Sequence, residues 1–395
     1  MPTLDPEAGG PPNSATNSTV AVGRRGVATT FVFTGDARSQ VSTRPARERM
    51  AEVGARTLLF PRPPRFEHQA GYWGVSLPLV VWLIRNIRRF DIVHLHYVWT
   101  LSTVTAAIAG ALTGRRVVLT PHESLTRFDI DVESGSTPKK LAKLAIRSLI
   151  MRCVDVVVTA SELEHDDSLE PGEHGVVIPH AVVDQAITEA TPEPASPPLT
   201  IGFLGRLASK KNVDVLLEAL AALPFEDARL VVCGDGDDRS RLEAIAADLQ
   251  VTDRVDWRGH VTPSGRRALF DECHFTVMAS SYEGFGMAAA EALAAGVPVI
   301  VSDRTGLAPV VREFNAGTIV EHSDVQSLVA GVLELSTEEE RRPRRAAAVQ
   351  AAQARLSYEA HGRALERVYR DLVHDEPADA FADEARQDLL QGVST

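Results

Sequence analysis

The chain has 395 residues, of which 44% are hydrophobic and 24% are charged. These proportions are those of globular proteins and argue against a chain that is mainly disordered, collagen-like or coiled-coil. The formal net charge of −12 argues against a protein that is basic along its whole length for binding nucleic acid. The length allows about two or three domains, each with a sizeable core.

Cysteine usage and hydropathy indicate a cytoplasmic protein. The three cysteines, Cys153, Cys233 and Cys273, are far apart and form no CxxC pair. This argues against a disulfide framework or a zinc site and fits a reducing compartment. The longest apolar run, 75–84, contains a proline and is too short to cross a bilayer. The acidic N-terminus lacks the layout of a signal peptide.

A regular alternation of strand-like and helix-like segments fills residues 1–185. Because the apolar runs show little polar alternation, they predict strands buried on both faces, as in a parallel sheet covered by helices. We therefore predict an N-terminal Rossmann-like, doubly wound α/β domain over 1–185. The expected strands are 27–34, 57–60, 91–96, 116–120, 155–160 and 176–179, and the expected helices are 14–25, 43–53, 76–90, 101–113, 138–152 and 161–168.

The beginning of this domain departs from the pattern. A doubly wound domain normally opens with a buried apolar strand that leads into a glycine-rich turn. Gly9 and Gly10 supply the turn, but no apolar strand stands before them in the sequence. We expect the true start of the protein to lie upstream; otherwise the first sheet lacks a central strand and the domain is weakened.

The pattern is interrupted at 186–198, where four prolines and no apolar periodicity predict a linker. It then resumes and predicts a second Rossmann-like domain over 199–356, followed by a C-terminal helix and an acidic tail over 357–395. The expected strands are 200–204, 229–233, 254–257, 275–278, 299–302 and 317–320, and the expected helices are 213–223, 238–249, 263–271, 287–295, 306–313, 324–335 and 338–355.

Two carboxylates flank a glycine-rich turn in the second domain. Glu283 and Glu291 stand on either side of Gly284-Phe285-Gly286, which ends a predicted strand and opens a predicted helix. The glycines let the backbone approach a ligand, and the first N–H groups of the helix suit a phosphate. Diphosphate in the middle with hydroxyls at both ends describes a nucleotide sugar. The alternative is that Glu283 is a surface carboxylate and Glu291 a solvated helix residue.

A pair of cations follows the first strand of the same domain. Gly205-Arg206-Leu207 leaves this strand, and Lys211 precedes the next helix. Cations at the carboxyl end of a strand, beside a helix N-terminus, suit a pyrophosphate. We predict that Arg206 and Lys211 lie beside the peptide nitrogens of 285–287. The alternative is a solvent-exposed basic loop.

These segments resemble the retaining glycosyltransferases of family GT4, which have the two-domain GT-B fold with a cleft between the domains. Glu283 and Glu291 with their turn resemble the E-x7-E signature of that family, and Gly205-Arg206-Leu207 with Lys211 resembles its G-R-L-x-x-x-K element. Segments 91–96 and 120–123 resemble its N-domain strands, and Gly9-Gly10 resembles its acceptor-side loop.

The resemblance implies a role for each residue. Arg206 and Lys211 would neutralise the donor diphosphate, and the backbone N–H groups of Phe285, Gly286 and Met287 would hold its oxygens. Glu291 would bind ribose hydroxyls.

By the same resemblance, Glu283 would bind hydroxyls of the transferred sugar. His122 would reach the donor sugar from the N-terminal domain. Gly205 would border the diphosphate, and Gly259 would lie near the base. No metal or other cofactor is implied.

Two weaker motifs favour structural roles. Asp235-Gly236-Asp237 has the D-x-D form of some metal sites, but it opens a predicted helix, so we expect a capping role. His94 and His96 alternate on a buried strand, and we expect hydrogen-bonded core histidines, with His96 bordering the cleft.

The charge is divided unevenly along the chain. Residues 1–152 hold 20 Lys/Arg and 11 Asp/Glu, a balance of +9, while the remaining residues hold 21 and 42, a balance of −21. One interpretation is ordinary solvated surface. The other is contact with an anionic membrane or a lipid-linked acceptor through the basic segments 79–90 and 138–152.

The sequence therefore predicts a metal-independent, retaining, hexosyltransferase-like enzyme of cell-surface polysaccharide or glycolipid synthesis. It would be cytoplasmic and could be peripheral on the inner face of the plasma membrane. Its partners would be a nucleoside-diphosphate sugar and a sugar or lipid-linked acceptor, without nucleic acid. Two alternatives stay open: another GT-B nucleotide-sugar enzyme such as an epimerase, and a non-catalytic partner of an active transferase.

Overall fold

The computed structural model describes residues 3–4, 9–36, 38–62, 76–184, 192–194 and 198–374. They fall into two compact units. The first unit holds the described residues up to Ala181 together with helix α15 (Tyr358–Val373), and the second spans Val182–Ser357. The last long helix thus belongs to the first unit, which the sequence pattern did not indicate. Most of the predicted linker and the acidic tail beyond 374 lie outside the described residues.

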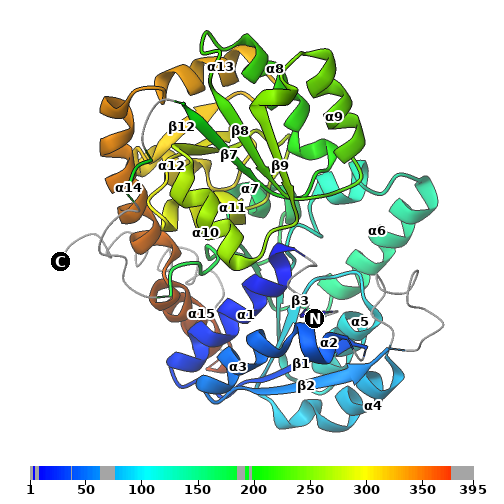
Figure 1. Ribbon diagram of the computed structural model, residues 1–395. Coiled ribbons are helices and arrows are strands. Elements are labelled where there is room, and N and C mark those ends of the chain that lie inside the picture. Colours follow the sequence, from blue (N-terminus) through cyan, green and yellow to red (C-terminus); the bar gives the residue numbers. More distant parts are fainter. Residues whose placement is uncertain are drawn as a thin grey trace. The chain divides into compact units, whose positions relative to one another are not determined.

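The second unit is built on a six-stranded, wholly parallel sheet (Figure 1). The strand order is β12-β11-β10-β7-β8-β9, which is the order of a doubly wound dinucleotide-binding domain. The strands are β7 (Thr200–Leu204), β8 (Arg229–Cys233), β9 (Val255–Gly259), β10 (Phe275–Met278), β11 (Val299–Ser302) and β12 (Gly317–Val320).

Helices cover this sheet and close one contiguous core. Ile201, Leu230 and Ile300 are fully buried, because residues on both faces of a central parallel strand are covered. The helices are α8 (Val213–Ala222), α9 (Arg239–Asp248), α10 (Pro263–Glu272), α11 (Met287–Ala294), α12 (Ala308–Phe314), α13 (Val325–Glu334) and α14 (Glu338–Leu356), with 3₁₀ turns η5 (Ser209–Lys211) and η6 (Thr252–Arg254).

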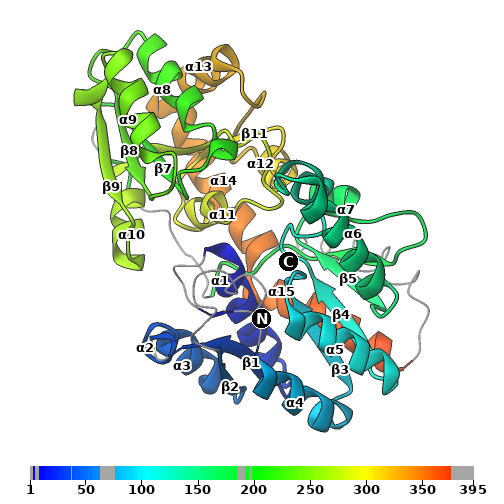
Figure 2. The same ribbon diagram turned by 90° about the vertical axis from the view of Figure 1, so that its right-hand side faces the viewer.

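The strands of the first unit form two separate parallel sheets. The two-stranded sheet pairs β1 (Thr30–Gly35) with β2 (Arg56–Pro61), and the other has the order β3-β4-β5-β6. Figure 2 shows β1 and β2 on one side and β3, β4 and β5 on the other. The strands of the second sheet are β3 (Ile92–His96), β4 (Arg116–Thr120), β5 (Val156–Thr159) and β6 (Gly175–Val177).

Helix α1 (Gly10–Arg24) begins four residues before the predicted helix at 14–25. Pro11 and Pro12 fit its first turn, where an N–H group would have no partner inside the helix. Within the described part of the chain, no strand precedes α1. The remaining elements are α2 (Ser39–Ser42), α3 (Arg44–Glu52), α4 (Leu77–Asn86), η3 (Ile87–Arg89), α5 (Leu101–Leu112), the π-helical turn η4 (Phe128–Val132), α6 (Thr137–Met151) and α7 (Glu162–Ser168).

The predicted doubly wound α/β fold is confirmed, and most predicted strands and helices agree with the structure to within a few residues. Among the described helices, none is both long enough and apolar enough to cross a bilayer.

Candidate functional site

The candidate site of the second unit lies where β7 and β10 end side by side. In the strand order of this sheet the two strands are neighbours, and the chain continues from them in opposite directions across the sheet. Helix α8, after β7, packs with α9 and α13, whereas α11, after β10, packs with α14. The loops that follow β7 and β10 therefore diverge at one edge, which is where open α/β sheets bind ligands.

An ion pair that is largely shielded from solvent joins these two loops. The Lys211 ammonium contacts the Glu283 carboxylate, and the two side chains are only 14% and 13% exposed. Beside the pair, the backbone N–H of Ser281 donates to the Lys210 carbonyl at 2.8 Å. The structure thus brings together one residue predicted to bind the diphosphate and one predicted to bind the transferred sugar. They come from segments 72 residues apart.

Asn212 supports this junction, and the sequence reasoning missed it. Its backbone is left-handed, with φ of 51°, a conformation that asparagine tolerates better than most residues. Its side-chain amide donates to the Ala279 carbonyl at 2.8 Å and to the Ser323 hydroxyl at 3.1 Å, and it accepts from Ser281. An asparagine directly after the cation and directly before a helix was the signal that could have identified it.

The turn from Glu283 to Met287 is held against the loop after β11. The Glu283 N–H donates to the Arg304 carbonyl, and the Gly306 N–H donates to the Glu283 carbonyl. Gly286 precedes α11 with φ of 101°, and a Cβ there would lie 3.1 Å from the Thr305 methyl group. Glycine is therefore required, and the leading N–H groups of α11, at Met287 and beyond, stand at the positive end of the helix.

Glu291 lies one turn inside α11 and is paired with Arg266 of α10. One guanidinium nitrogen donates to both carboxylate oxygens, at 2.9 and 3.0 Å. Burial raises the pKa of Glu291, and Arg266 opposes that shift. The alternative reading of Glu291 as a solvated helix residue is wrong, and Arg266 is a second residue that sequence reasoning missed.

The loop after β7 is packed backbone to backbone against the loop after β8. The Gly205 N–H donates to Cys233 and the Leu207 N–H donates to Asp235, both at 3.0 Å. A Cβ on Gly234 would collide with the Gly205 carbonyl oxygen. Gly259, at the end of β9, accepts from the Gly234 N–H at 2.7 Å, so these glycine loops form one layer at the edge of the sheet.

Arg206 is the most exposed of the predicted site residues in this unit. Its guanidinium is 68% exposed and contacts the Asp237 carboxylate at 3.4 Å, a pair that contributes little to stability. The capping role expected for Asp235 and Asp237 is wrong. Helix α9 begins at Arg239 after Asp238, while the Asp235 carboxylate accepts from the N–H of Gly236. Across the described residues, no group of three His, Cys, Asp or Glu side chains is placed to hold a metal ion.

A row of imidazoles crosses the first unit. The rings of His94 and His96 stack with centroids 4.5 Å apart, His96 follows His122 at 5.3 Å, and His122 follows His180 at 5.4 Å. The His96 Nδ1 and His122 Nε2 atoms are 3.0 Å apart. Burial lowers the pKa of His94 and of His122 to about 3, so the row is neutral near pH 7.

Each end of the row is tied by hydroxyl groups. His94 bonds the Tyr369 hydroxyl of α15 and the Thr120 hydroxyl of β4, as the expected core histidine would. His180 bonds Ser14 of α1 through its Nδ1 at 2.9 Å. Helix α1 starts at Gly10, and Gly9 before it has φ of 97°, so the predicted glycine turn is present in this unit.

The loop that carries His122 depends on a buried carboxyl group. His122 and Glu123 have φ of 52° and 68°. The Glu164 carboxylate accepts the Glu123 N–H and the Ala160 N–H, each at 2.7 Å. Burial raises the pKa of Glu164 to about 7. Ser161-x-x-Glu164 has the spacing of a helix-capping box, and this signal could have singled out the residue.

Comparison with known protein families shows which family the chain belongs to. The family description "Glycosyl transferases group 1" matches residues 184–355, and "Glycosyl transferase 4-like domain" matches residues 9–180. The chain belongs to the group 1 glycosyltransferases. It is therefore a transferase, and the family resemblance read from its motifs is confirmed.

Relatives of this glycosyltransferase include two proteins named D-inositol 3-phosphate glycosyltransferase. That of Corynebacterium urealyticum is 28% identical over 306 residues, 72% of each chain. That of Xylanimonas cellulosilytica is 29% identical over 316 residues, covering 73% of this chain and 74% of the relative.

Solved structures show the same fold. HepE of Anabaena, in complex with UDP-glucose, has a TM-score of 0.70 at 17% identity, covering 94% of this chain and 98% of HepE. Sucrose-phosphate synthase from Thermosynechococcus elongatus has a TM-score of 0.64 at 18% identity, covering 88% of this chain and all of the synthase chain.

Within this glycosyltransferase, the structure joins Lys211 to Glu283 and places Glu291 on the helix that follows the Gly286 turn. Arg206 and Gly259 lie on adjoining loops of the same unit. The ligand roles of these residues, of Gly205 and of the N–H groups at Phe285, Gly286 and Met287 stay predictions. His122, Gly9 and Gly10 lie in the first unit, and their roles also stay predictions.

The neutral imidazole row predicts a loss of stability in mild acid. When the folded pKa lies below the unfolded value, the unfolded state takes up protons first, so the folding free energy falls as pH drops below about 6.5. At pH 5 each such imidazole costs about 2 kcal/mol relative to pH 7.5. We expect the melting temperature of His94→Gln to depend less steeply on pH than that of the wild type between pH 7.5 and 4.5.

The exposed histidine His174 provides the matched control, since His174→Gln removes an imidazole that lies outside the row. Glu164 changes the pH dependence of stability in the opposite direction, because its pKa is raised in the folded state. All three proteins contain Glu164, so its contribution cancels when their pH dependences are compared. An identical pH dependence for His94→Gln and wild type would contradict the assignment.

Proposed function

We propose that this glycosyltransferase transfers a sugar, with retention of configuration, from a nucleoside-diphosphate sugar to an acceptor hydroxyl. The observation that carries the proposal is the largely shielded contact of Lys211 with Glu283 beside the N-terminus of α11. A cation, a carboxylate and helix N–H groups converge at one edge of the sheet. The complexes of HepE with UDP and UDP-glucose support a donor of this chemical class.

The proposed chemistry is electrostatic. As the bond between the sugar and the diphosphate breaks, negative charge grows on the leaving phosphate oxygen. Lys211, Arg206 and the N–H groups around Gly286 and Met287 would stabilise that charge, and well-aimed donors of this kind each contribute several kcal/mol. Because the Lys211 side chain is much less exposed than that of Arg206, its charge is screened less by solvent.

The two carboxylates would position the donor at its two ends. Glu283, beside Lys211, would accept hydrogen bonds from hydroxyls of the transferred sugar. Glu291 would accept them from ribose, and Arg266 would hold its carboxylate ionised and in place. For retention, the acceptor hydroxyl would attack on the face that the diphosphate leaves and pass its proton to the leaving phosphate oxygen.

We further propose an anionic acceptor or acceptor surface, in polysaccharide or glycolipid synthesis. The excess of positive charge lies in residues 1–152, which belong to the first unit. Two of its helices combine exposed apolar and basic side chains. Leu77, Val81 and Ile84 are exposed on α4 beside Arg85, and Leu141 is exposed on α6.

The first test concerns the cations. Lys211→Ala should weaken binding of the free nucleoside diphosphate by about tenfold, equivalent to about 1.4 kcal/mol. Arg206→Ala should weaken it less, because an exposed charge contributes less. Calorimetry would measure the affinity of both variants for a nucleoside diphosphate. The ligand would be UDP, GDP or ADP, whichever stabilises the protein most. Arg229→Ala, exposed at the opposite end of β8, is the control, and equal affinities in all four proteins would refute the site.

The second test separates Glu283 from nucleotide binding. Glu283→Ala should lower turnover by at least about tenfold while changing affinity for the nucleoside diphosphate much less, since the carboxylate faces the sugar in this proposal. Turnover and calorimetric affinity measured on the same preparation would check it. A variant that keeps its turnover but loses nucleotide affinity would show that Glu283 binds the nucleotide end of the donor and would contradict the proposed contact with the sugar.

The third test concerns the membrane. The wild type should sediment with vesicles that contain about a third anionic lipid, and added salt should release it. Leu77→Ser combined with Ile84→Ser should reduce sedimentation, whereas Leu333→Ser, exposed in the second unit, should not. Absence of salt-sensitive binding by the wild type would exclude membrane contact.

A further inference from the structure

Four loops meet at the carboxyl edge of the sheet in the second unit. They follow β7 and the three strands on one side of it, β10, β11 and β12. Because β12 lies three places from β7, at about 4.8 Å per place, these two strands are about 14 Å apart. Their loops nevertheless touch, since the Asn212 amide donates to the Ser323 hydroxyl at 3.1 Å. The loops after β7 and β12 therefore fold toward each other across the ends of β10 and β11.

The Asn212 side chain is the point at which these loops are joined. It is 8% exposed, and its nitrogen faces the Ala279 carbonyl, which can only accept. This contact fixes the orientation of the amide, and its oxygen then accepts from the Ser281 hydroxyl at 3.0 Å. One buried side chain thus ties its own loop to the loop after β10 and, through Ser323, to the loop after β12.

Both residues at the contact between the loops after β7 and β12 have a left-handed backbone. The φ angle is 51° at Asn212 and 58° at Ser323. Asparagine adopts this conformation readily, whereas serine does so less often. A serine held there indicates that the surrounding contacts, rather than local preference, set the backbone. Two such residues in direct contact indicate a fixed junction rather than a variable surface loop.

The loop after β11 closes a ring of contacts. The Asp303 carboxylate accepts from the backbone N–H of His322 at 3.0 Å, which joins this loop to the loop after β12. The backbone of Glu283 is bonded to the loop after β11 through both its N–H and its carbonyl. Contacts therefore run from Asn212 through the loops after β12 and β11 to Glu283, and the ion pair with Lys211 returns to the residue before Asn212.

The ion pair needs this support for a physical reason. Lysine carries a point charge on a flexible stem, so its own geometry does not fix the position of the ammonium. The Lys211 and Glu283 side chains are largely shielded, so a small shift of either loop changes the distance between two charges that solvent screens little. A displacement of about 1 Å in a positioned group can lower a reaction rate about a hundredfold.

We propose, on the basis of the donor role proposed above for Lys211 and Glu283, that Asn212 is a positioning residue for sugar transfer. It would act through these two charged residues, by holding the loops after β7, β10 and β12 in one arrangement, without contacting the donor itself. The Ser323 hydroxyl would contribute from the other side of the ring. An exposed serine outside the proposed donor contacts would therefore affect donor binding.

The first experiment measures nucleotide affinity in a double-mutant cycle. Asn212→Gly keeps the left-handed backbone and removes the three side-chain hydrogen bonds. We expect it to weaken calorimetric binding of the nucleoside diphosphate about fivefold, but less than about twofold when Lys211 is already alanine, because its effect passes through that ammonium. A merely structural role would lower the melting temperature and would change affinity equally in both backgrounds.

Asn315 provides the matched control. It is exposed, has φ of 54° and follows α12 just before β12, at the opposite edge of the sheet. Asn315→Gly makes the same substitution in the same backbone conformation and should leave nucleotide affinity unchanged. If Asn212→Gly fails to fold, Ser323→Gly tests the same ring from an exposed position and should weaken binding about twofold to threefold.

A second measurement needs no nucleotide. Competitive acetylation followed by mass spectrometry compares how fast each lysine reacts, and an ammonium held in an ion pair reacts slowly. In Asn212→Gly we expect Lys211 to be labelled at least about fivefold faster than in the wild type, because its loop opens more often. The exposed Lys139 of α6 is the internal reference.

The two measurements separate this proposal from the proposed donor site. If neither Lys211→Ala nor Asn212→Gly changes nucleotide affinity while labelling of Lys211 becomes faster, the donor site is refuted and the hold of Asn212 on Lys211 is retained. The positioning role is refuted if Lys211→Ala weakens binding and Asn212→Gly does not, if the two effects add, or if labelling stays unchanged. Equal loss of affinity in Asn315→Gly would refute it as well. Weaker binding that depends on Lys211, with faster labelling, would establish it.

Discussion

The proposed donor site depends on one constraint of parallel sheets, which is that all carboxyl ends of the strands meet at the same edge. In the second unit β7 and β10 are neighbours at the point where the winding reverses, so their loops leave side by side while their helices diverge. Lys211 and Glu283 come from these two loops. Taking both charges out of water is costly, and their mutual attraction in the ion pair offsets part of that cost.

Close packing of backbone fixes the loops around this pair. Gly234 lies against the Gly205 carbonyl, and Gly286 lies against Thr305 and Met278, where a side chain would not fit. Arg206, by contrast, is exposed, and its contact with Asp237 contributes little to stability.

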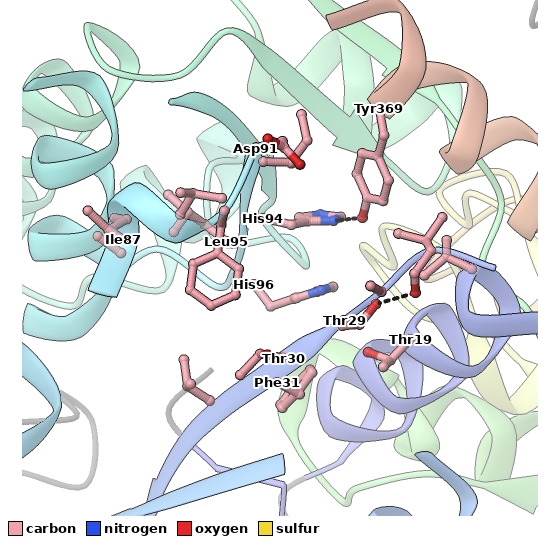
Figure 3. Close-up of a pocket in the computed structure, with 18 of the residues that line it drawn as sticks. Thr19, Thr29, Thr30, Phe31, Ile87, Asp91, His94, Leu95, His96 and Tyr369 are labelled. Atoms are coloured by element: carbon pink, nitrogen blue, oxygen red, sulfur yellow. Dashed lines mark hydrogen bonds between the residues drawn. The ribbon is translucent and has the colours of Figure 1, made fainter. Parts of the chain in front are cut away.

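The two units differ in how their described strands are grouped into sheets. The second has six parallel strands in one sheet, with a strand at its centre. The first has two parallel sheets and a cavity bordered by the His94 and His96 side chains and by β1 (Figure 3). Its neutral imidazole row is held by hydroxyl groups and by the buried Glu164 behind the His122 loop, so this unit carries buried polar groups close to its cavity.

The sequence by itself determined the alternation of strands and helices, the glycine turns, and the Glu283, Glu291, Arg206 and Lys211 motifs, because these depend on local periodicity and on residues close in the chain. Only the tertiary structure decided which groups meet. The pairing of Lys211 with Glu283, of Glu291 with Arg266 and of Glu164 with the His122 loop joins segments far apart in sequence. The return of α15 to the first unit, and the grouping of the strands of that unit into two sheets, also depend on contacts between distant segments, which local patterns do not encode.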